Sequence, residues 1–138
     1  MHKIKIGVIG TGYLGSLHAK LYSQIETCTL VGICDIQKDR VDTVAAELHV
    51  PGFTDYKELF DKVDAVSIVV PTQLHYAVAK DFLGRHIHTL VEKPFTTTLK
   101  EADALIARAK QHRLILQVGH IERFNSAFAA TCKIIHEP

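Results

Sequence analysis

The chain has 138 residues, of which 47% are hydrophobic and 22% charged, and its formal net charge is +1. This length and composition predict one soluble globular domain, and the near-neutral charge excludes a global electrostatic attraction to nucleic acid or to a membrane surface. No apolar run approaches the roughly 18 residues of a membrane span, and the three cysteines, which form no CxxC pair, favour reduced thiols in a cytoplasmic protein.

Short apolar runs alternate with helix-like segments along the chain. The runs are rich in Val and Ile and lack polar alternation, as strands buried on both faces of a parallel sheet do; they cover residues 4–9, 30–34, 65–70, 88–91 and 114–118. Helices are predicted over about residues 14–24, 38–49, 74–84, 99–111 and 125–135, and Thr98 and Glu101 have the spacing of a capping box. This order predicts an α/β fold, a doubly wound parallel sheet in a single domain.

The first predicted strand leads into a glycine-rich loop. The loop is Gly10-Thr11-Gly12-Tyr13-Leu14-Gly15, and it opens a helix, the context in which a G-x-G-x-x-G pattern indicates a dinucleotide site. Gly10 permits a tight turn, Gly12 lets the backbone approach a pyrophosphate, and Gly15 lets the helix pack close to the strand. The helix N-terminus supplies free N–H groups to the phosphates. We therefore predict a Rossmann-type domain, with Tyr13 and Leu14 among its cofactor contacts.

An acidic residue ends the second predicted strand. Asp35 stands twenty positions after Gly15, where a carboxylate can accept hydrogen bonds from the adenosine ribose hydroxyls and repel a 2′-phosphate. The alternative is structural, with Asp35 capping the helix that starts near Lys38. The pattern favours NAD over NADP as the cofactor, although Lys38 and Arg40 lie close enough in the sequence to offer a 2′-phosphate some positive charge.

Polar groups follow three further predicted strands, at Pro71-Thr72, Glu92-Lys93-Pro94 and Gly119-His120. In an open α/β sheet, ligands bind beyond the carboxyl ends of the strands, so these groups are candidates for the chemistry. Pro94 biases Lys93 away from helical geometry and keeps its side chain extended from the strand. Lys93 could then hydrogen-bond a substrate hydroxyl and help it lose a proton as hydride leaves. The alternative is a solvated ammonium paired with Glu92.

Four histidines have less decided roles. His75 could contact a cofactor ribose, or cap and pack at a helix start, and the local sequence favours neither. His18, in the first predicted helix, is expected to be a packed, hydrogen-bonded side chain rather than a ligand. His86 and His88 could share a strand face, but with no third ligand in view they predict no metal site.

Several motifs together resemble a known family. They are residues 7–15 followed by His18-Ala19, then Val70-Pro71-Thr72-x-x-His75, Val91-Glu92-Lys93-Pro94 and Gly119-His120-Ile121-Glu122-Arg123-Phe124-Asn125. This set resembles the Gfo/Idh/MocA oxidoreductases, relatives of glucose–fructose oxidoreductase and inositol dehydrogenase. The resemblance implies an NAD-dependent dehydrogenase in which Lys93 lies near nicotinamide and substrate and the Lys93–Pro94 peptide is cis. It also implies that four residues lie along the cofactor: Pro71, Thr72, His75 and Glu92.

The segment 119–125 is most similar to family members that act on nucleotide sugars, such as UDP-N-acetylglucosamine 3-dehydrogenases. This similarity implies a sugar or nucleotide-sugar substrate. It also implies that His120 is a second catalytic residue, with Arg123 beside it at the nicotinamide end. Ser126 stands where the family commonly has proline, a difference expected to matter little for the chemistry.

The resemblance also divides the chain. Residues 1–120 are expected to form the NAD(P)-binding domain, and residues 121–138 a terminal helix that leads to the family's C-terminal α+β substrate domain, which is absent. We therefore expect impaired turnover and, through the apolar residues of 121–138, a homo-oligomer or a segment-swapped dimer. The alternative function is an NAD(H)-binding module or sensor that acts through a partner. A nucleic-acid regulator is least favoured, since the sequence has no basic stripe.

Overall fold

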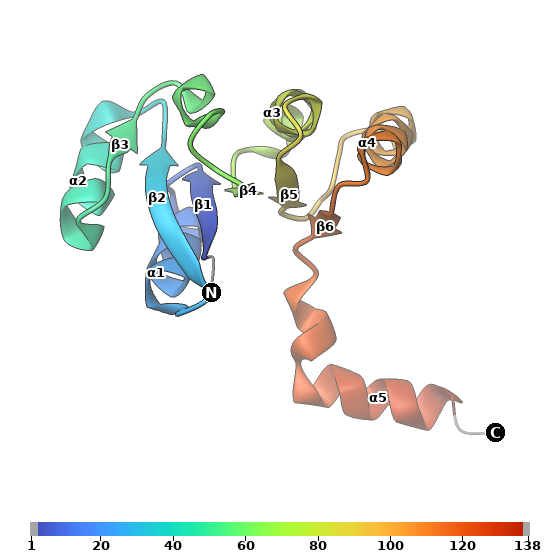
Figure 1. The fold of residues 1–138 in the computed structure, drawn as a ribbon. Coiled ribbons are helices and arrows are strands. Elements are labelled where there is room, and N and C mark those ends of the chain that lie inside the picture. Colours follow the sequence, from blue (N-terminus) through green and yellow to red (C-terminus); the bar gives the residue numbers. More distant parts are fainter. Residues whose placement is uncertain (1–2, 137–138) are drawn as a thin grey trace.

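A computed structural model describes residues 3–136 and shows a parallel sheet with helices on both of its faces (Figure 1). Within the described residues the sheet has six strands in the order β3-β2-β1-β4-β5-β6, and all neighbouring pairs are parallel. The strands are β1 (Ile4–Ile9), β2 (Cys28–Cys34), β3 (Gly52–Phe53), β4 (Ala65–Ile68), β5 (His88–Val91) and β6 (Leu116–Val118). Strand order reverses between β1 and β4. The structure confirms the predicted α/β, doubly wound fold.

Helices cover both faces of the sheet. The covering helices are α1 (Tyr13–Gln24), α2 (Lys38–Leu48), α3 (Thr72–Gly84) and α4 (Leu99–His112), with the 3-10 helix η1 (Tyr56–Leu59) after β3. A second 3-10 helix, η2 (Ile121–Phe124), and α5 (Ser126–His136) follow β6. Ala19 of α1 and Val41 of α2 pack on one face, against β1 and β2. α3 and α4 pack together on the other face. The predicted capping box is present at the start of α4, where Thr98 and Glu101 each accept the other's backbone N–H.

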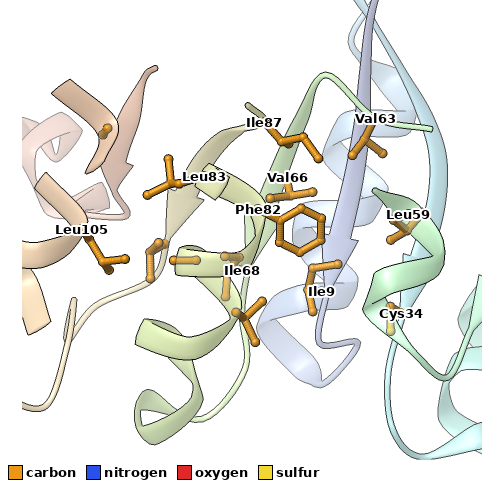
Figure 2. Close-up of a cluster of buried hydrophobic side chains, with 14 residues drawn as sticks. Ile9, Cys34, Leu59, Val63, Val66, Ile68, Phe82, Leu83, Ile87 and Leu105 are labelled. Atoms are coloured by element: carbon orange, nitrogen blue, oxygen red, sulfur yellow. The ribbon is translucent and has the colours of Figure 1, made fainter. Parts of the chain in front are cut away.

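The larger core cluster lies between the sheet and the α3–α4 layer (Figure 2). Phe82 is fully buried there and contacts the rings of Tyr56 and Phe60, with centroid distances of 5.8 and 5.1 Å. Ile9 of β1 and Ile68 of β4 belong to the same cluster. Full burial of such a side chain contributes about 1.5–3 kcal/mol. The cluster therefore holds in place the strands whose carboxyl ends form the candidate site.

The strands differ from the prediction in one end each of β2, β4 and β6 and in the presence of β3. β2 begins at Cys28, two residues before the predicted start. β4 ends at Ile68, so Val69 and Val70 belong to the loop after the strand. The last strand is shorter than predicted and begins at Leu116. The sequence does not predict β3, because Gly52 and Phe53 form no apolar run. This strand is defined by its pairing with the end of β2, which depends on the tertiary fold.

The C-terminal segment leaves the sheet, and α5 extends away from it (Figure 1). Phe124 and Ile134 expose 85% and 73% of their surface, and Phe128 and Ile135 are exposed as well. These exposed apolar side chains motivate the expected self-association, which stays a prediction, as does the domain boundary at residue 120. Residues 137 and 138 of that segment lie outside the described part. From residue 3 to residue 136, no helix has the length and hydropathy needed to cross a membrane.

Candidate functional site

A cleft of about 690 Å³ opens at the carboxyl ends of the strands, where strand order reverses. Its walls bring together most of the residues predicted for a cofactor site: Gly10, Gly12, Tyr13, Leu14, Gly15, Asp35, Arg40, Pro71, Glu92 and Lys93. Three residues of the same prediction are not among the lining residues: Thr72, His75 and His120. The role of each residue stays a prediction, but the sheet order alone brings segments from four parts of the sequence to one place.

Two glycines allow the loop and the strand ends to approach closely. Gly10 has a φ of 91°, and a Cβ there would collide with the Val69 carbonyl at the strand-order reversal. A Cβ on Gly15 would collide with the Gly10 carbonyl oxygen. Gly12 differs, because nothing lies within 4 Å of the position that its Cβ would take. The fold therefore requires glycine at positions 10 and 15, whereas Gly12 leaves open space beside the helix start.

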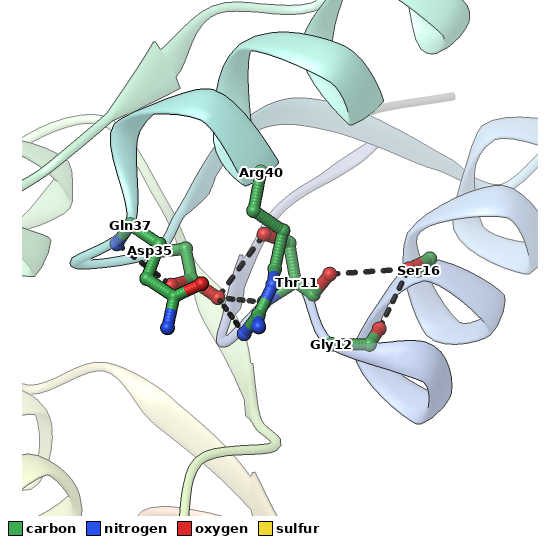
Figure 3. Close-up of polar contacts among 6 residues, drawn as sticks. All are labelled: Thr11, Gly12, Ser16, Asp35, Gln37 and Arg40. Carbon is green, nitrogen blue, oxygen red and sulfur yellow. Dashed lines mark hydrogen bonds and ion pairs between the residues drawn. The ribbon is translucent and has the colours of Figure 1, made fainter.

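The N-terminus of α1 has free hydrogen-bond donors. Its N-cap is Gly12, no side chain caps it, and its first turn contains no acidic residue. Ser16 is not a substitute cap, because its hydroxyl donates to the carbonyl oxygens of Gly12 and Thr11 at 2.6 and 3.2 Å (Figure 3). The N–H groups of the first turn also carry the positive end of the helix dipole. Such a helix start is suited to binding a phosphate.

Asp35 is anchored at the end of β2 (Figure 3). Its Oδ2 accepts hydrogen bonds from the Thr11 N–H and hydroxyl at 2.8 and 3.2 Å, and its Oδ1 accepts one from the Gln37 N–H at 2.9 Å. Arg40 Nη1 lies 3.5 Å from Oδ2. Burial raises the pKa of this carboxyl, but the hydrogen bonds from Gln37 and Thr11 and the charge of Arg40 outweigh burial and lower the pKa. The N-cap of α2 is Gln37 rather than Asp35.

Replacing Asp35 with asparagine is expected to change how fold stability depends on pH. Because the folded-state pKa lies below the ordinary value of 3.8, ionised Asp35 stabilises the fold above that value, and this stabilisation is lost as the pH falls through the folded-state pKa. Urea denaturation at a series of pH values from 7 downward should show a smaller acid-induced loss of stability in Asp35→Asn than in the wild type. Asp39→Asn, on exposed α2 surface, is the control. Equal losses in Asp35→Asn and the wild type would contradict this prediction.

Glu92 and Lys93 form the wall of the cleft after β5. The Lys93–Pro94 peptide is cis, as the resemblance implies. Lys93 is exposed, and in the described chain no ion pair joins its ammonium to Glu92. The contact between the two residues in the described chain is a hydrogen bond from the Lys93 backbone N–H to Glu92 Oε2, at 3.2 Å. The Glu92 carboxylate turns inward, where Oε1 lies 3.3 Å from His18 Nε2. The predicted alternative, in which Lys93 pairs with Glu92, is therefore not what the structure shows.

His75 lies behind the wall of the cleft. Its ring is buried, with Nε2 2.8 Å from the Val70 carbonyl oxygen and Nδ1 2.9 Å from the Pro94 carbonyl oxygen. The ring therefore joins the loop after β4 to the loop after β5. This arrangement agrees with the packing alternative that the sequence left open. It does not place His75 against the cleft.

The remaining predicted residues lie at element ends. Thr72 begins α3, His120 is exposed where β6 leads into η2, and Arg123 lies in η2. The cleft also has lining residues that the sequence analysis missed. Ile36 lines it with 84% of its surface exposed, and its position directly after Asp35 was the available signal. Tyr56 lines it as well, but it follows β3, for which the sequence carries no signal.

A thiol also borders the cleft. Cys34 is buried at the end of β2, and burial, with a smaller contribution from Asp35, raises its pKa to about 12. The thiol is therefore protonated at neutral pH. Across residues 3–136, no group of three His, Cys, Asp or Glu side chains is arranged to hold a metal ion.

The fold and the cleft match a known family. A family model described as "Oxidoreductase family, NAD-binding Rossmann fold" matches residues 4–120. The chain belongs to the Gfo/Idh/MocA oxidoreductase family. This assignment confirms the resemblance drawn from the motifs, including the NAD-binding character of the domain.

Known Gfo/Idh/MocA proteins are similar over nearly the whole chain. UDP-N-acetylglucosamine 3-dehydrogenase from Acidithiobacillus ferrooxidans is 45% identical over 92% of this chain and 40% of its own length. A solved structure of that enzyme aligns with a TM-score of 0.89 and 42% identity, over 97% of this chain and 44% of the other. scyllo-Inositol dehydrogenase from Lactobacillus casei, solved with bound NAD(H) and scyllo-inositol, has a TM-score of 0.89 and 27% identity, over 97% and 41% of the two chains.

This Gfo/Idh/MocA chain is also similar to scyllo-inositol 2-dehydrogenase from Bacillus subtilis. It spans about 40% of the length of that enzyme and of the Acidithiobacillus ferrooxidans enzyme. By their names, these relatives are dehydrogenases of a UDP-sugar and of scyllo-inositol. The matches support an NAD-binding oxidoreductase domain. They give no support to the alternative expectation of a sensor that acts through a partner.

Proposed function

We propose that the chain binds NAD in the cleft and forms the nucleotide-binding part of an oxidoreductase that takes hydride from a hydroxyl-bearing carbon of a sugar. One observation carries the proposal: Asp35 after β2, the start of α1 after β1 and Lys93 after β5 line a single cleft, and these strands lie in the order β2-β1-β4-β5. A dinucleotide presents matching groups in the same order, namely adenosine ribose, pyrophosphate and nicotinamide. The cleft volume of about 690 Å³ also lies in the range of small-molecule sites, roughly 300–1,000 Å³.

The adenosine end favours NAD over NADP. A 2′-phosphate would meet the Asp35 carboxylate, which is ionised at neutral pH and held in place by hydrogen bonds from Thr11 and Gln37. The two cations that could offset this repulsion are already paired. Arg40 lies against Asp35 itself, and Lys38 bonds to Asp42 at 2.6 Å.

Lys93 is the residue that we assign to the reaction. Its exposed ammonium lies in the cleft wall after β5 and has no ion-pair partner in the described chain. Bound NAD would supply the hydride acceptor. Lys93 would hydrogen-bond the substrate hydroxyl, orient the carbon that gives its hydride to NAD, and stabilise negative charge on the oxygen while the hydroxyl proton passes to solvent water. His120 and Arg123, in the segment after β6, are proposed to border the same end.

The substrate class that we propose is a nucleotide sugar. The support is the 45% identity to a UDP-N-acetylglucosamine 3-dehydrogenase over 92% of this chain, together with the motif at residues 119–125. The substrate named for the Lactobacillus casei structure, scyllo-inositol, is likewise a ring that carries several hydroxyl groups. A ring hydroxyl is therefore the proposed point of attack.

Cofactor titration tests the first part of the proposal. NADH and NADPH are added separately to the chain and followed by nicotinamide fluorescence, and NADH should bind at least about tenfold more tightly, a difference of about 1.4 kcal/mol. NAD is then offered with a panel of UDP-sugars, free sugars and inositols, and NADH formation is followed by absorbance. No binding of either cofactor would overturn the proposed site. Tight binding without reduction by any compound would contradict only the dehydrogenase part.

Lys93→Met is expected to separate binding from turnover. Removing the ammonium takes away the group that hydrogen-bonds the reacting hydroxyl, so the rate of NAD reduction should fall about 10²-fold. NADH affinity should stay within about threefold, because the pyrophosphate and ribose contacts lie elsewhere in the cleft. Lys100→Met, an exposed lysine of α4 outside the cleft, is the matched control. A wild-type rate in Lys93→Met would remove Lys93 from the proposed reaction.

A further inference from the structure

A buried carboxylate at the end of β5 has an oxygen without a hydrogen-bond partner. Glu92 is 4% exposed, and its Oε2 accepts the Lys93 N–H at 3.2 Å. Its Oε1 accepts no hydrogen bond in the described chain. Facing it from α1 is His18, with Nε2 3.3 Å away. Because a buried carboxylate is costly unless its surroundings compensate it, this electrostatic contact with His18 matters to the position of Glu92.

The other ring nitrogen determines which proton His18 presents. Nδ1 lies 2.8 Å from the Ser67 hydroxyl of β4, and Tyr22, one turn further along α1, contacts the ring edge with centroids 6.5 Å apart. Burial lowers the pKa of His18 more than Glu92 raises it, so the ring is neutral at pH 7. We assign the Ser67 hydroxyl as the donor to Nδ1, which puts the single proton of the neutral ring on Nε2. That proton faces the Glu92 carboxylate.

The end of β6 leaves room for the carboxylate but offers it no side chain. A Cβ on Gly119 would collide with Glu92 Oε1, so this position has to be glycine while Glu92 points inward. The Gly119 N–H is engaged with the Val91 carbonyl oxygen at 2.8 Å. Glu92 is therefore enclosed by α1, β5 and β6, and the polar groups that contact it are His18 and the Lys93 N–H.

We propose that His18 is a positioning residue that holds the Glu92 carboxylate against the Lys93 N–H and so fixes how Lys93 enters the cleft. The contact connects the helix that begins at the pyrophosphate region to the residue at the nicotinamide end. The inference rests on the proposed function, because the direction of Lys93 has a consequence only for a bound cofactor and substrate. Without its partner, the carboxylate gains by turning to water in the cleft, and the Lys93 N–H loses its acceptor.

Two amide substitutions at position 18 distinguish the two ring nitrogens. His18→Gln places its amide nitrogen where Nε2 lies and keeps a donor near Glu92. The Asn side chain of His18→Asn is one methylene shorter than Gln, so its amide can contact Ser67 but cannot reach Glu92. Two measurements are made, namely hydrogen exchange of the Lys93 amide in the free chain by NMR and the rate of NAD reduction. His18→Asn should speed the exchange and slow NAD reduction, each about tenfold or more, whereas His18→Gln should keep both within about threefold.

A double-mutant cycle tests whether His18 acts through Glu92. In a Glu92→Gln background, His18→Asn should change neither measurement by more than about twofold, because the carboxylate that His18 compensates is gone. Ser23→Ala is the control, since Ser23 is exposed on the same helix and its hydroxyl donates to the Lys20 carbonyl oxygen rather than to Ser67 or Glu92. It should match the wild type within about twofold in both measurements.

The possible outcomes separate this inference from the proposed function. Equal effects of His18→Asn and His18→Gln, a larger effect of His18→Gln, or full additivity with Glu92→Gln would each overturn the positioning role. If the wild type binds no NADH, the proposed function fails, but the order of the variants in Lys93 amide exchange still decides whether His18 holds Glu92. If His18→Asn does not fold, Glu92→Met, which has no acceptor oxygen, should speed Lys93 amide exchange about tenfold or more relative to the wild type, and no change would overturn the inference.

Discussion

Gly15→Ala is expected to abolish measurable NADH binding and to destabilise the fold. The new Cβ would collide with the Gly10 carbonyl oxygen. Gly10 lies in the loop and Gly15 in the first turn of α1, so the collision can be relieved only by shifting the loop or the helix. Overpacking of this kind costs about 3 kcal/mol of unfolding free energy. Displacement of the helix start from the phosphates should weaken NADH at least about 100-fold. Urea denaturation and fluorescence titration measure the two effects.

Gly12→Ala is the matched control, because it adds the same methyl group three residues earlier, in open space. Nothing lies within 4 Å of its Cβ, and Gly12 has a φ of −63°, which alanine adopts without strain. Its unfolding free energy should stay within about 0.5 kcal/mol of the wild type. NADH binding should nevertheless fall, since the methyl group occupies the approach of the pyrophosphate. Equal destabilisation by the two substitutions would contradict the structure of the loop.

Phe82→Ala is expected to cost about 3–5 kcal/mol of unfolding free energy. Phe82 is fully buried and packs against Tyr56 and Phe60 in the larger core cluster (Figure 2), so its removal leaves a cavity lined by rings that cannot fill it. A loss of this size is a large part of the 5–15 kcal/mol that stabilises an ordinary domain. The midpoint and slope of urea denaturation give the value.

Phe124→Ala deletes the same atoms at an exposed position and serves as the comparison. Phe124 exposes 85% of its surface in η2, so the substitution should change the unfolding free energy by no more than about 0.5 kcal/mol. A large loss from Phe124→Ala would show that this side chain is covered in solution, as the expected self-association requires. A small loss from Phe82→Ala would contradict the core described here.

The sequence predicts the fold well because local signals and tertiary structure agree in it. The Val- and Ile-rich runs of β1, β2 and β4 are mostly buried in a sheet of parallel strands, whereas β6 at the sheet edge is partly exposed. The capping box at Thr98 and Glu101 forms where its spacing indicates. β3 escapes prediction for the opposite reason, because two residues without an apolar run are held only by pairing with β2. Val69 and Val70 have strand-like side chains, but they form the loop that turns toward the cleft.

The candidate site is predictable where a motif fixes it and not where distant residues meet. The glycine loop and Asp35 follow from spacing, yet the bonds that join Thr11 to Asp35 span 24 positions and appear only in the structure. The sequence allows the ring of His75 to face the cleft or to pack behind it. The structure shows the packed position, in which the ring nitrogens contact the carbonyl oxygens of Pro94 and Val70. The contact between His18 and Glu92 joins α1 to the end of β5, and no local pattern indicates it.

The buried thiol at the end of β2 has a practical consequence for labelling. Because burial raises the pKa of Cys34 to about 12, its thiol in the wall of the cleft is protonated at pH 8 and reacts slowly with alkylating reagents and mild oxidants. Maleimide dyes can therefore be attached to the folded chain without modifying that wall. A dye that did react at Cys34 would report that β2 had opened.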